Sequence, residues 1–270
     1  MLSPNLFNTV LIIPTLNLLV FLYQCFLVIK VPGAFGLAIV GLTVLVRLLV
    51  QPLFGKQMQT AKKMQDLKPH LDKLSTKHKN DKQKLQEEQM RLYKEAGINP
   101  ASGCLFMIIQ IPLFIALYNT LSLFLVTTNI QKVIGEINQV LYFPFLKIYS
   151  IDPNFLGYNL FLSPDKAKIW YYYLIPVITA LLQYFQVVVS TPAMTPQPKK
   201  EEAGKEGEKK ESTGEDFQKA MNTQMKFIFP IMIGYFAFSL PVGLALYWNI
   251  FSLFSIIHSR GINKSKDSVK

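Results

Sequence analysis

The feature that most constrains this chain is a set of apolar runs, each about as long as a membrane is thick. Five such runs cover residues 6–29, 35–54, 104–126, 169–189 and 227–257. A helix needs about 20 apolar residues to cross a bilayer, and helices satisfy their own backbone hydrogen bonds in lipid. Because half of the 270 residues are hydrophobic and most of them fall in these runs, we predict an all-α integral membrane protein.

Two of the runs are irregular. Residues 227–257 would extend about 46 Å as one helix, against a hydrocarbon core of about 30 Å, so Pro241 near the middle predicts two helices. Pro14, Asn17 and Gln24 interrupt the first run. They favour a helix that lies at the outer interface, and a true span is the alternative.

Charge between the runs predicts the topology. Residues 55–98 hold 11 Lys and Arg against 6 acids, whereas residues 127–168 hold 4 against 3. Because basic loops stay in the cytoplasm, the first segment is predicted inside and the second outside. The basic tail from Ser259 also lies inside if the last run crosses the membrane twice.

The charged segment 55–98 has the pattern of a helical hairpin. A narrow apolar seam repeats every three or four residues through Met64, Leu67, Leu71 and Leu74, and residues 79–81 offer a turn before a second helix. Pro69 is expected to kink the first arm. A solvated coiled coil and a docking site for partners or lipid headgroups are both compatible with this pattern.

These patterns divide the chain into nine parts. They are an N-terminal apolar helix (1–34), core helix 1 (35–54), a cytoplasmic helical hairpin (55–98), core helix 2 (99–126), an extracytoplasmic segment (127–168), core helix 3 (169–190), a flexible charged cytoplasmic loop (191–225), core helices 4 and 5 joined near Pro241 (226–258) and a basic cytoplasmic tail (259–270).

Arg47 is the most informative single residue, because it lies inside the apolar run 35–54. A charge at such a depth costs about 2.5–3.5 kcal/mol on insertion scales. No acidic residue occurs in any of the five runs, so the sequence offers no counter-ion within the membrane. Arg47 therefore needs water, a headgroup phosphate or an anionic ligand, and snorkelling to the interface is the weaker alternative.

Polar residues form stripes on several of the predicted helices. Thr43, Arg47 and Gln51 share one helical face. The others are Gln110 on core helix 2, the stripe Thr179, Gln183, Gln186 and Ser190 on core helix 3, and the stripe Trp248, Ser252 and Ser255, with Tyr247 beside it, on core helix 5. Hydrogen bonds between helices, each contributing about 0.6 kcal/mol, are the simpler account of the glutamines.

The residues of the apolar runs also argue against an enzyme that makes or breaks covalent bonds. No His or acid lies in any run for general acid–base catalysis, and there is no Gly-rich phosphate loop or pair of metal ligands. We therefore expect no enzyme activity, no metal and no cofactor. Cys25 and Cys104 suggest no disulfide. The basic hairpin lacks features that read nucleic acid, so we expect no DNA partner, while weak contact with ribosomal RNA stays open.

Four motifs in order resemble the YidC/Oxa/Alb membrane protein insertases. They are GLTVLVRLLVQPL at 41–53, YKEAGINPASGC at 93–104, QIPLFIALY at 110–118 and PVGLALYW at 241–248. The resemblance extends from residue 35 to residue 257 and includes the charged hairpin. Each motif alone is modest in length, and the four together at these separations are specific.

The resemblance implies five core transmembrane helices around a hydrophilic groove that opens to the cytoplasm and to lipid. By resemblance, Arg47 is the groove arginine, with Thr43 one turn before it, Gln183 the groove glutamine, and Tyr247 and Trp248 the aromatic pair of the fifth core helix. We add Gln51 and Gln110 to this predicted substrate groove. The implied partners are nascent membrane proteins, the lipid bilayer and the Sec translocon, without a cofactor.

The sequence thus predicts an insertase in a prokaryotic inner membrane that guides small or acid-tailed membrane proteins into the bilayer, alone or with the Sec translocon. The tail 259–270 is too short for the ribosome-binding helix of mitochondrial members, so ribosome contact is expected to be weak. One alternative is a small anion transporter with Arg47 as its ligand site, although the internal symmetry typical of transporters is missing. A structural scaffold for helix packing is the third.

Overall fold

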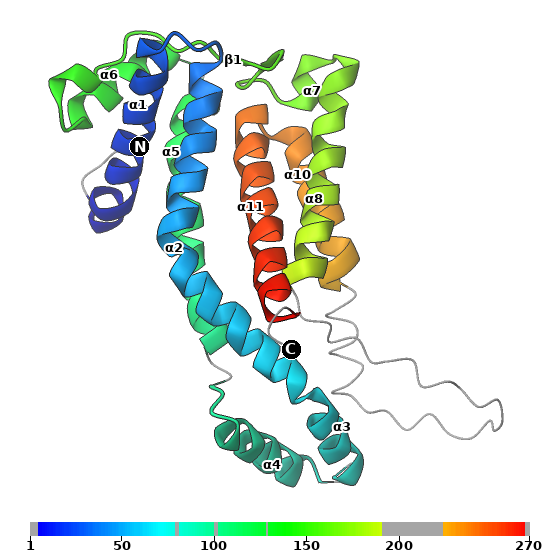
Figure 1. The fold of residues 1–270 in the computed structure, drawn as a ribbon. Coiled ribbons are helices and arrows are strands. Elements are labelled where there is room, and N and C mark those ends of the chain that lie inside the picture. The colour runs from blue at the N-terminus through cyan, green and yellow to red at the C-terminus, as the bar shows by residue number, and fades with distance from the viewer. Residues whose placement is uncertain (1–4, 79–80, 100–101, 128, 191–223, 268–270) are drawn as a thin grey trace.

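The computed structural model describes residues 5–78, 81–99, 102–127, 129–190 and 224–267, which are mostly helical (Figure 1). Four stretches in these ranges are long and apolar enough to cross a membrane, and two shorter apolar helices accompany them. The long stretches are Asn8–Val28, Ala34–Leu53, Trp170–Val189 and Val242–Gly261, and the shorter ones are Ile111–Leu125 and Lys226–Ser239. The chain is therefore an all-α, multi-pass membrane protein, as predicted.

Two predicted features fall on residues that the structure does not describe. The charged loop predicted at 191–225 lies almost wholly within the gap 191–223, and the turn predicted at 79–81 includes residues 79–80. Asp81 is described and caps the helix that follows, because its side chain accepts a hydrogen bond of 3.0 Å from the Lys84 amide.

The N-terminal apolar segment forms a short π-helix, η1 (Asn8–Ile12), and then α1 (Ile13–Val28). α1 packs beside the first half of α2 (Ala34–Asp66) after a turn in which Lys30 and Gly33 have positive φ angles of 58° and 74°. Gly33 suits this turn because it has no Cβ.

α2 continues beyond residue 54, where core helix 1 was predicted to end. It runs through Pro52 and Gly55 to Asp66, and it curves toward α3 in its lower part (Figure 1). A proline removes one backbone hydrogen bond and bends a helix without always ending it, and the Lys, Gln and Ala residues that follow favour helix. The first arm of the hairpin is therefore an extension of core helix 1.

The rest of the hairpin consists of α3 (Lys68–Lys77) and α4 (Lys82–Glu95). Pro69 lies in the first turn of α3 and not within a kinked helix. A proline is tolerated there because its missing N–H has no partner in a first turn. The predicted kink is thus a break between α2 and α3.

The segment after α5 (Ser102–Leu125) forms a layer of short elements across one end of the helices (Figure 1). It contains α6 (Ile130–Val140), η2 (Pro144–Leu146), the strands β1 (Asn154–Phe155) and β2 (Tyr158–Asn159), α7 (Pro164–Ala167) and η3 (Trp170–Tyr173). The strands form an antiparallel pair in which Phe155 lies opposite Tyr158. The Phe155 ring lies against Gly36 of α2, where an added Cβ would approach it to 2.2 Å.

The last apolar run is divided at Pro241. The short π-helix η4 (Gln224–Ile228) and α10 (Phe229–Ser239) precede it, and α11 (Val242–Asp267) follows it. The first amides of a helix have no hydrogen-bond acceptor within that helix. For α11, the layer of short elements supplies the acceptors. The Val242 and Gly243 amides donate to the carbonyl oxygens of Leu162 and Leu160, each at 2.9 Å.

α11 packs against both α2 and α8 (Leu174–Ser190), and α8 also packs against α10 (Figure 1). Near the layer of short elements the core is aromatic. Phe35 is 1% exposed, and its ring lies 5.4 Å from the Phe124 ring and 5.8 Å from the Tyr23 ring. This apolar end leaves the polar residues of α2, α8 and α11 to gather farther along the helices.

Candidate functional site

Arg47 lies buried between α2 and α11, with 5% of its surface exposed. Its Nη2 donates a hydrogen bond of 3.3 Å to the Phe251 carbonyl oxygen and another to Ser255 Oγ. Its guanidinium carbon also lies 3.5 Å from the centroid of the Phe251 ring, which is the geometry of a cation–π contact. These contacts are with neutral groups, and they bind the cation without cancelling its charge.

The two α2 residues one turn from Arg47 differ in what they contact. Thr43 is 1% exposed and donates to the Ile39 carbonyl oxygen of its own helix at 2.7 Å. Gln51 lies one turn farther along α2, where its Nε2 is 3.4 Å from Nδ1 of His258 on α11. Gln51 and His258 thus connect α2 with α11 beyond Arg47.

α11 is also hydrogen-bonded to α8, through Gln183. The indole Nε1 of Trp248 donates to Gln183 Oε1 at 2.9 Å, and Ser252 Oγ lies 3.4 Å from the same oxygen. Gln183 and Ser252 are both buried. α11 therefore makes polar contacts with both α2 and α8.

The aromatic pair of α11 faces α5. The Phe114 ring lies 5.2 Å from Trp248 and 6.1 Å from Tyr247 between ring centroids. Tyr247 is 2% exposed, and its hydroxyl has no hydrogen-bond partner among the described residues. Gln110 lies in α5, but its side chain is not described.

Two cavities border these residues, and they differ in size and lining. The one beside Arg47 has a volume of about 10 Å³ and is lined by Arg47, Gln51, Phe254, Ser255 and His258. That volume holds about one water molecule, so the predicted hydrophilic groove stays a prediction. The other, of about 290 Å³, is mostly apolar and is lined by α5, α8, α10 and α11, including Tyr247 and Trp248 but not Arg47.

The structure therefore brings the predicted site residues together in two groups along α11. Arg47 and Gln51 form one group with Ser255 and His258, and Gln183, Tyr247 and Trp248 form the other. Within the described residues no group of His, Cys, Asp or Glu could hold a metal ion. The site offers hydrogen-bonding groups and the guanidinium of Arg47, which attracts anionic groups.

Three residues of the site did not emerge from the sequence. Phe251 and Phe114 contact Arg47 and Trp248, but a phenylalanine in an apolar run carries no signal of that role. His258 could have been found, because it continues the three- and four-residue spacing of Ser252 and Ser255 along α11.

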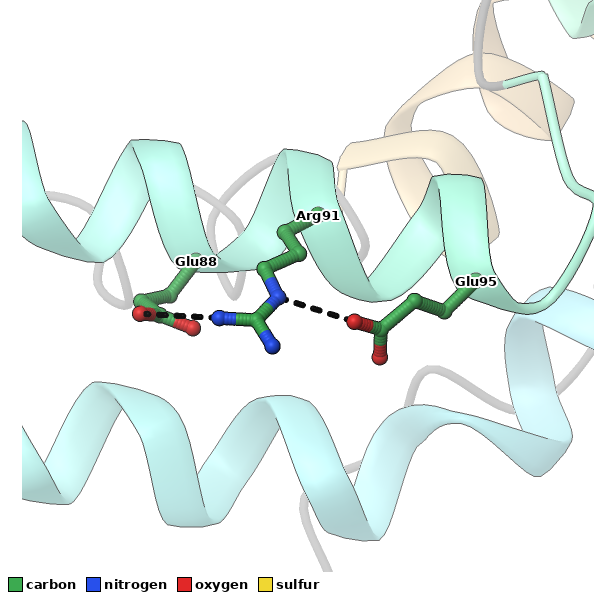
Figure 2. Close-up of polar contacts among 3 residues, drawn as sticks. All are labelled: Glu88, Arg91 and Glu95. Atoms are coloured by element: carbon green, nitrogen blue, oxygen red, sulfur yellow. Dashed lines mark hydrogen bonds and ion pairs between the residues drawn. The ribbon is translucent and has the colours of Figure 1, made fainter.

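The hairpin has a second polar feature, a cleft of about 310 Å³ between α3 and α4. On α4, Arg91 Nε donates to Glu95 at 2.8 Å, and Nη1 lies 4.0 Å from Glu88 (Figure 2). The hydrogen bond to Glu95 raises the pKa of Arg91 above its usual value. Because Arg91 engages both glutamates, Lys73 and Lys77 of α3 leave the cleft net positive.

Comparison with known proteins identifies the family. The chain matches the family described as 60Kd inner membrane protein over residues 27–269. It is 30% identical to the membrane protein insertase YidC of Oceanobacillus iheyensis, over 97% of this chain and 85% of that protein. It is 31% identical to YidC 1 of Listeria monocytogenes, over 86% and 64%, and 29% identical to chloroplastic ALBINO3 of Arabidopsis thaliana, over 89% and 50%. This chain belongs to the 60Kd inner membrane protein family, which is the YidC/Oxa/Alb family that its motifs resemble.

Proposed function

We propose that this protein is a membrane protein insertase that guides small or acid-tailed membrane proteins from the cytoplasm into the lipid bilayer. The observation that carries the proposal is the cation of Arg47, buried among helices whose apolar runs contain no acid and hydrogen-bonded to the neutral Phe251 carbonyl and Ser255 hydroxyl. The relatives named as insertases support it. A nascent membrane protein and the bilayer are the partners that this function requires.

In the proposed mechanism the protein lowers the free-energy barrier to membrane insertion and forms no covalent bond with the substrate. A translocating segment moves polar backbone and side chains through hydrocarbon, where each unsatisfied polar group costs several kcal/mol. Polar side chains on α2, α8 and α11 replace some of the lost water contacts. The apolar segment of the substrate then moves sideways into lipid, and burial of its surface drives the process.

Arg47 engages the substrate by exchange of partners. Its guanidinium is already held by Phe251 and Ser255 of α11, so a substrate must displace these neutral acceptors. A carboxylate does so favourably, because it can accept two parallel N–H bonds from the guanidinium and its opposite charge adds Coulomb attraction. The exchange requires α2 and α11 to separate near Gln51 and His258, which opens the groove toward the cytoplasm.

The experiment replaces Arg47 with Ala and with Lys in cells depleted of the native protein. Arg47→Ala should reduce insertion of an acid-tailed substrate about tenfold or more, since a hydrogen bond to a charged group contributes about 1.5–3 kcal/mol. Arg47→Lys should retain part of the activity, because charge matters more than the planar geometry of the guanidinium. Lys63→Ala, at an exposed position of α2, is the matched control.

Full insertion by Arg47→Ala would refute the role of the cation. Purified protein in liposomes distinguishes the insertase from the transporter alternative, because an insertase should insert a small model protein and should carry no flux of small anions.

We further propose that the C-terminal tail and the hairpin lie in the cytoplasm, that the Sec translocon takes part for some substrates, and that ribosome contact is weak. The excess of basic residues in the hairpin supports this orientation.

A further inference from the structure

The amide of Gln183 is oriented by two residues of α11. Trp248 Nε1 donates to its oxygen at 2.9 Å, and Ser252 Oγ lies 3.4 Å from that oxygen. An indole nitrogen can only donate a hydrogen bond, so the atom that faces it must be the amide oxygen. The orientation therefore follows from the chemistry of Trp248, although oxygen and nitrogen of an amide look alike in shape.

This orientation decides what Gln183 offers on its other side. With the oxygen occupied on α11, the amide nitrogen and its two N–H groups point away from Trp248 and Ser252. Among the described residues, no hydrogen-bond acceptor for this nitrogen is found. Gln183 thus presents donors, and a rotated amide would instead present an acceptor.

Arg47, on α2, gives the site the same polarity. A guanidinium has five N–H donors and no acceptor, and Arg47 already donates to Phe251 and Ser255. Because Arg47 and Gln183 both contact α11, a segment passing along this helix meets donors from both residues. Such a surface favours carbonyl and carboxylate oxygens over ammonium groups.

We propose that Trp248 is a positioning residue that, together with Ser252, orients the Gln183 amide so that it presents only N–H donors to a translocating polypeptide. The inference rests on the proposed insertase function, and it adds a preference for segments rich in hydrogen-bond acceptors. Trp248 acts here through Gln183 and not by touching the substrate.

A direct test of the contact is independent of insertion. The chain has two tryptophans, and Trp170 is 75% exposed, so ¹⁵N-labelled indole groups should give two NMR signals in nanodiscs. We expect the Trp248 N–H to exchange with solvent deuterium much more slowly than the Trp170 N–H. Gln183→Met should shift the Trp248 signal and speed its exchange, while Gln183→Glu, which keeps the acceptor oxygens, should preserve the slow exchange. Equal exchange of both indoles in the native protein would overturn the proposal.

The functional test uses two single-span substrates that differ at one translocated residue, Glu in one and Lys in the other. Trp248→Phe keeps a ring against Phe114 but removes the N–H donor. We expect it to reduce insertion of the Glu substrate about three- to tenfold, the range for one hydrogen bond, with little change for the Lys substrate. Gln183→Glu should lose the same preference, because it lacks both N–H donors.

Trp170→Phe, at an exposed position, is the control and should leave both substrates unaffected. An equal loss for both substrates in Trp248→Phe would indicate a purely structural role and overturn the proposal, as would no change for either. If the native protein inserts neither substrate, the proposed function fails, and the NMR result then stands as a separate statement about Gln183.

Discussion

At the scale of single residues, the site is built from donors that meet neutral acceptors. Arg47 bonds to a carbonyl, a hydroxyl and an aromatic ring, and these partners come from one turn of α11. A buried carboxylate would neutralise the cation permanently, and no positive charge would remain to attract a substrate. Neutral partners hold the side chain in place, and a charged ligand can replace them.

The first prediction concerns Ser255, whose hydroxyl accepts a hydrogen bond from Arg47. Ser255→Ala should lower the stability of the protein by about 1–3 kcal/mol, because the buried guanidinium loses one of its hydrogen-bond acceptors. The thermal unfolding midpoint in detergent is the measurement. Ser122→Ala is the control, since Ser122 only donates to the Tyr118 carbonyl of its own helix. Equal midpoints for the two variants would contradict the prediction.

At the scale of elements, α11 holds α2 and α8 together, and α8 in turn packs on α10. The contact between α8 and α10 is close because Gly234 has no side chain. An added Cβ there would lie 2.9 Å from Ala180 Cβ and 3.1 Å from the Pro176 carbonyl oxygen. By contrast, the contact between α2 and α11 near Gln51 and His258 is made between longer polar side chains, with 3.4 Å between Gln51 Nε2 and His258 Nδ1.

The α8–α10 contact predicts that Gly234→Ala destabilises the protein. Because the clash involves backbone atoms of α8, the helices must move apart, at a cost of about 1–3 kcal/mol. Gly135→Ala in α6 is the matched control, since no atom lies within 4 Å of its added Cβ. Thermal unfolding of the two variants in the same detergent compares them, and a lower midpoint for Gly135→Ala would refute this account of the packing.

The α2–α11 contact predicts that insertion needs these helices to separate. In a variant with Cys25 and Cys104 replaced by Ser, a short thiol-to-thiol crosslinker between Gln51→Cys and His258→Cys should abolish insertion. A cleavable reagent should restore the activity after reduction. Each single cysteine variant treated with the same reagent is the control. Continued insertion by the crosslinked protein would show that the groove does not open at this position.

At the scale of the whole molecule, the layer of short elements fixes how α1 lies. Asn17 of α1 accepts a hydrogen bond of 2.7 Å from the Tyr142 amide, and Gln24 donates to the Lys147 carbonyl at 3.0 Å. The irregular backbone from residue 141 to 150 therefore follows α1 for about 10 Å. Tyr142, Phe143 and Phe145 are all more than half exposed on it.

Irregular backbone exposed to lipid is not tolerated within the hydrocarbon, whereas aromatic side chains favour the interface. Although α1 is long and apolar enough to span the membrane, we therefore predict that it lies at the outer interface. In a variant lacking Cys25 and Cys104, Ser3→Cys should be labelled by an impermeant thiol reagent from outside the cell. Ser150→Cys should label from outside and Ser75→Cys only from inside. Labelling of Ser3→Cys from inside alone would show that α1 crosses the bilayer.

Local properties of the sequence predict much of the architecture. The apolar runs determine where membrane helices form, since the bilayer sets both their length and their composition. Pro241 separates α10 from α11, because the residue before a proline is biased toward extended backbone and Leu240 adopts it, whereas α2 continues through Pro52. Arg47 stands out for the same reason, as one charge in a run that lipid would otherwise solvate poorly.

The tertiary structure alone decided which of these residues meet. Phe251 and Phe114 became part of the site through packing, which is a property of pairs far apart in the chain and leaves no local signal. The orientation of Gln183 depends on Trp248, 65 residues away. Composition and periodicity report the solvent that each helix faces, but the partner of a buried polar group depends on how the helices are arranged around α11.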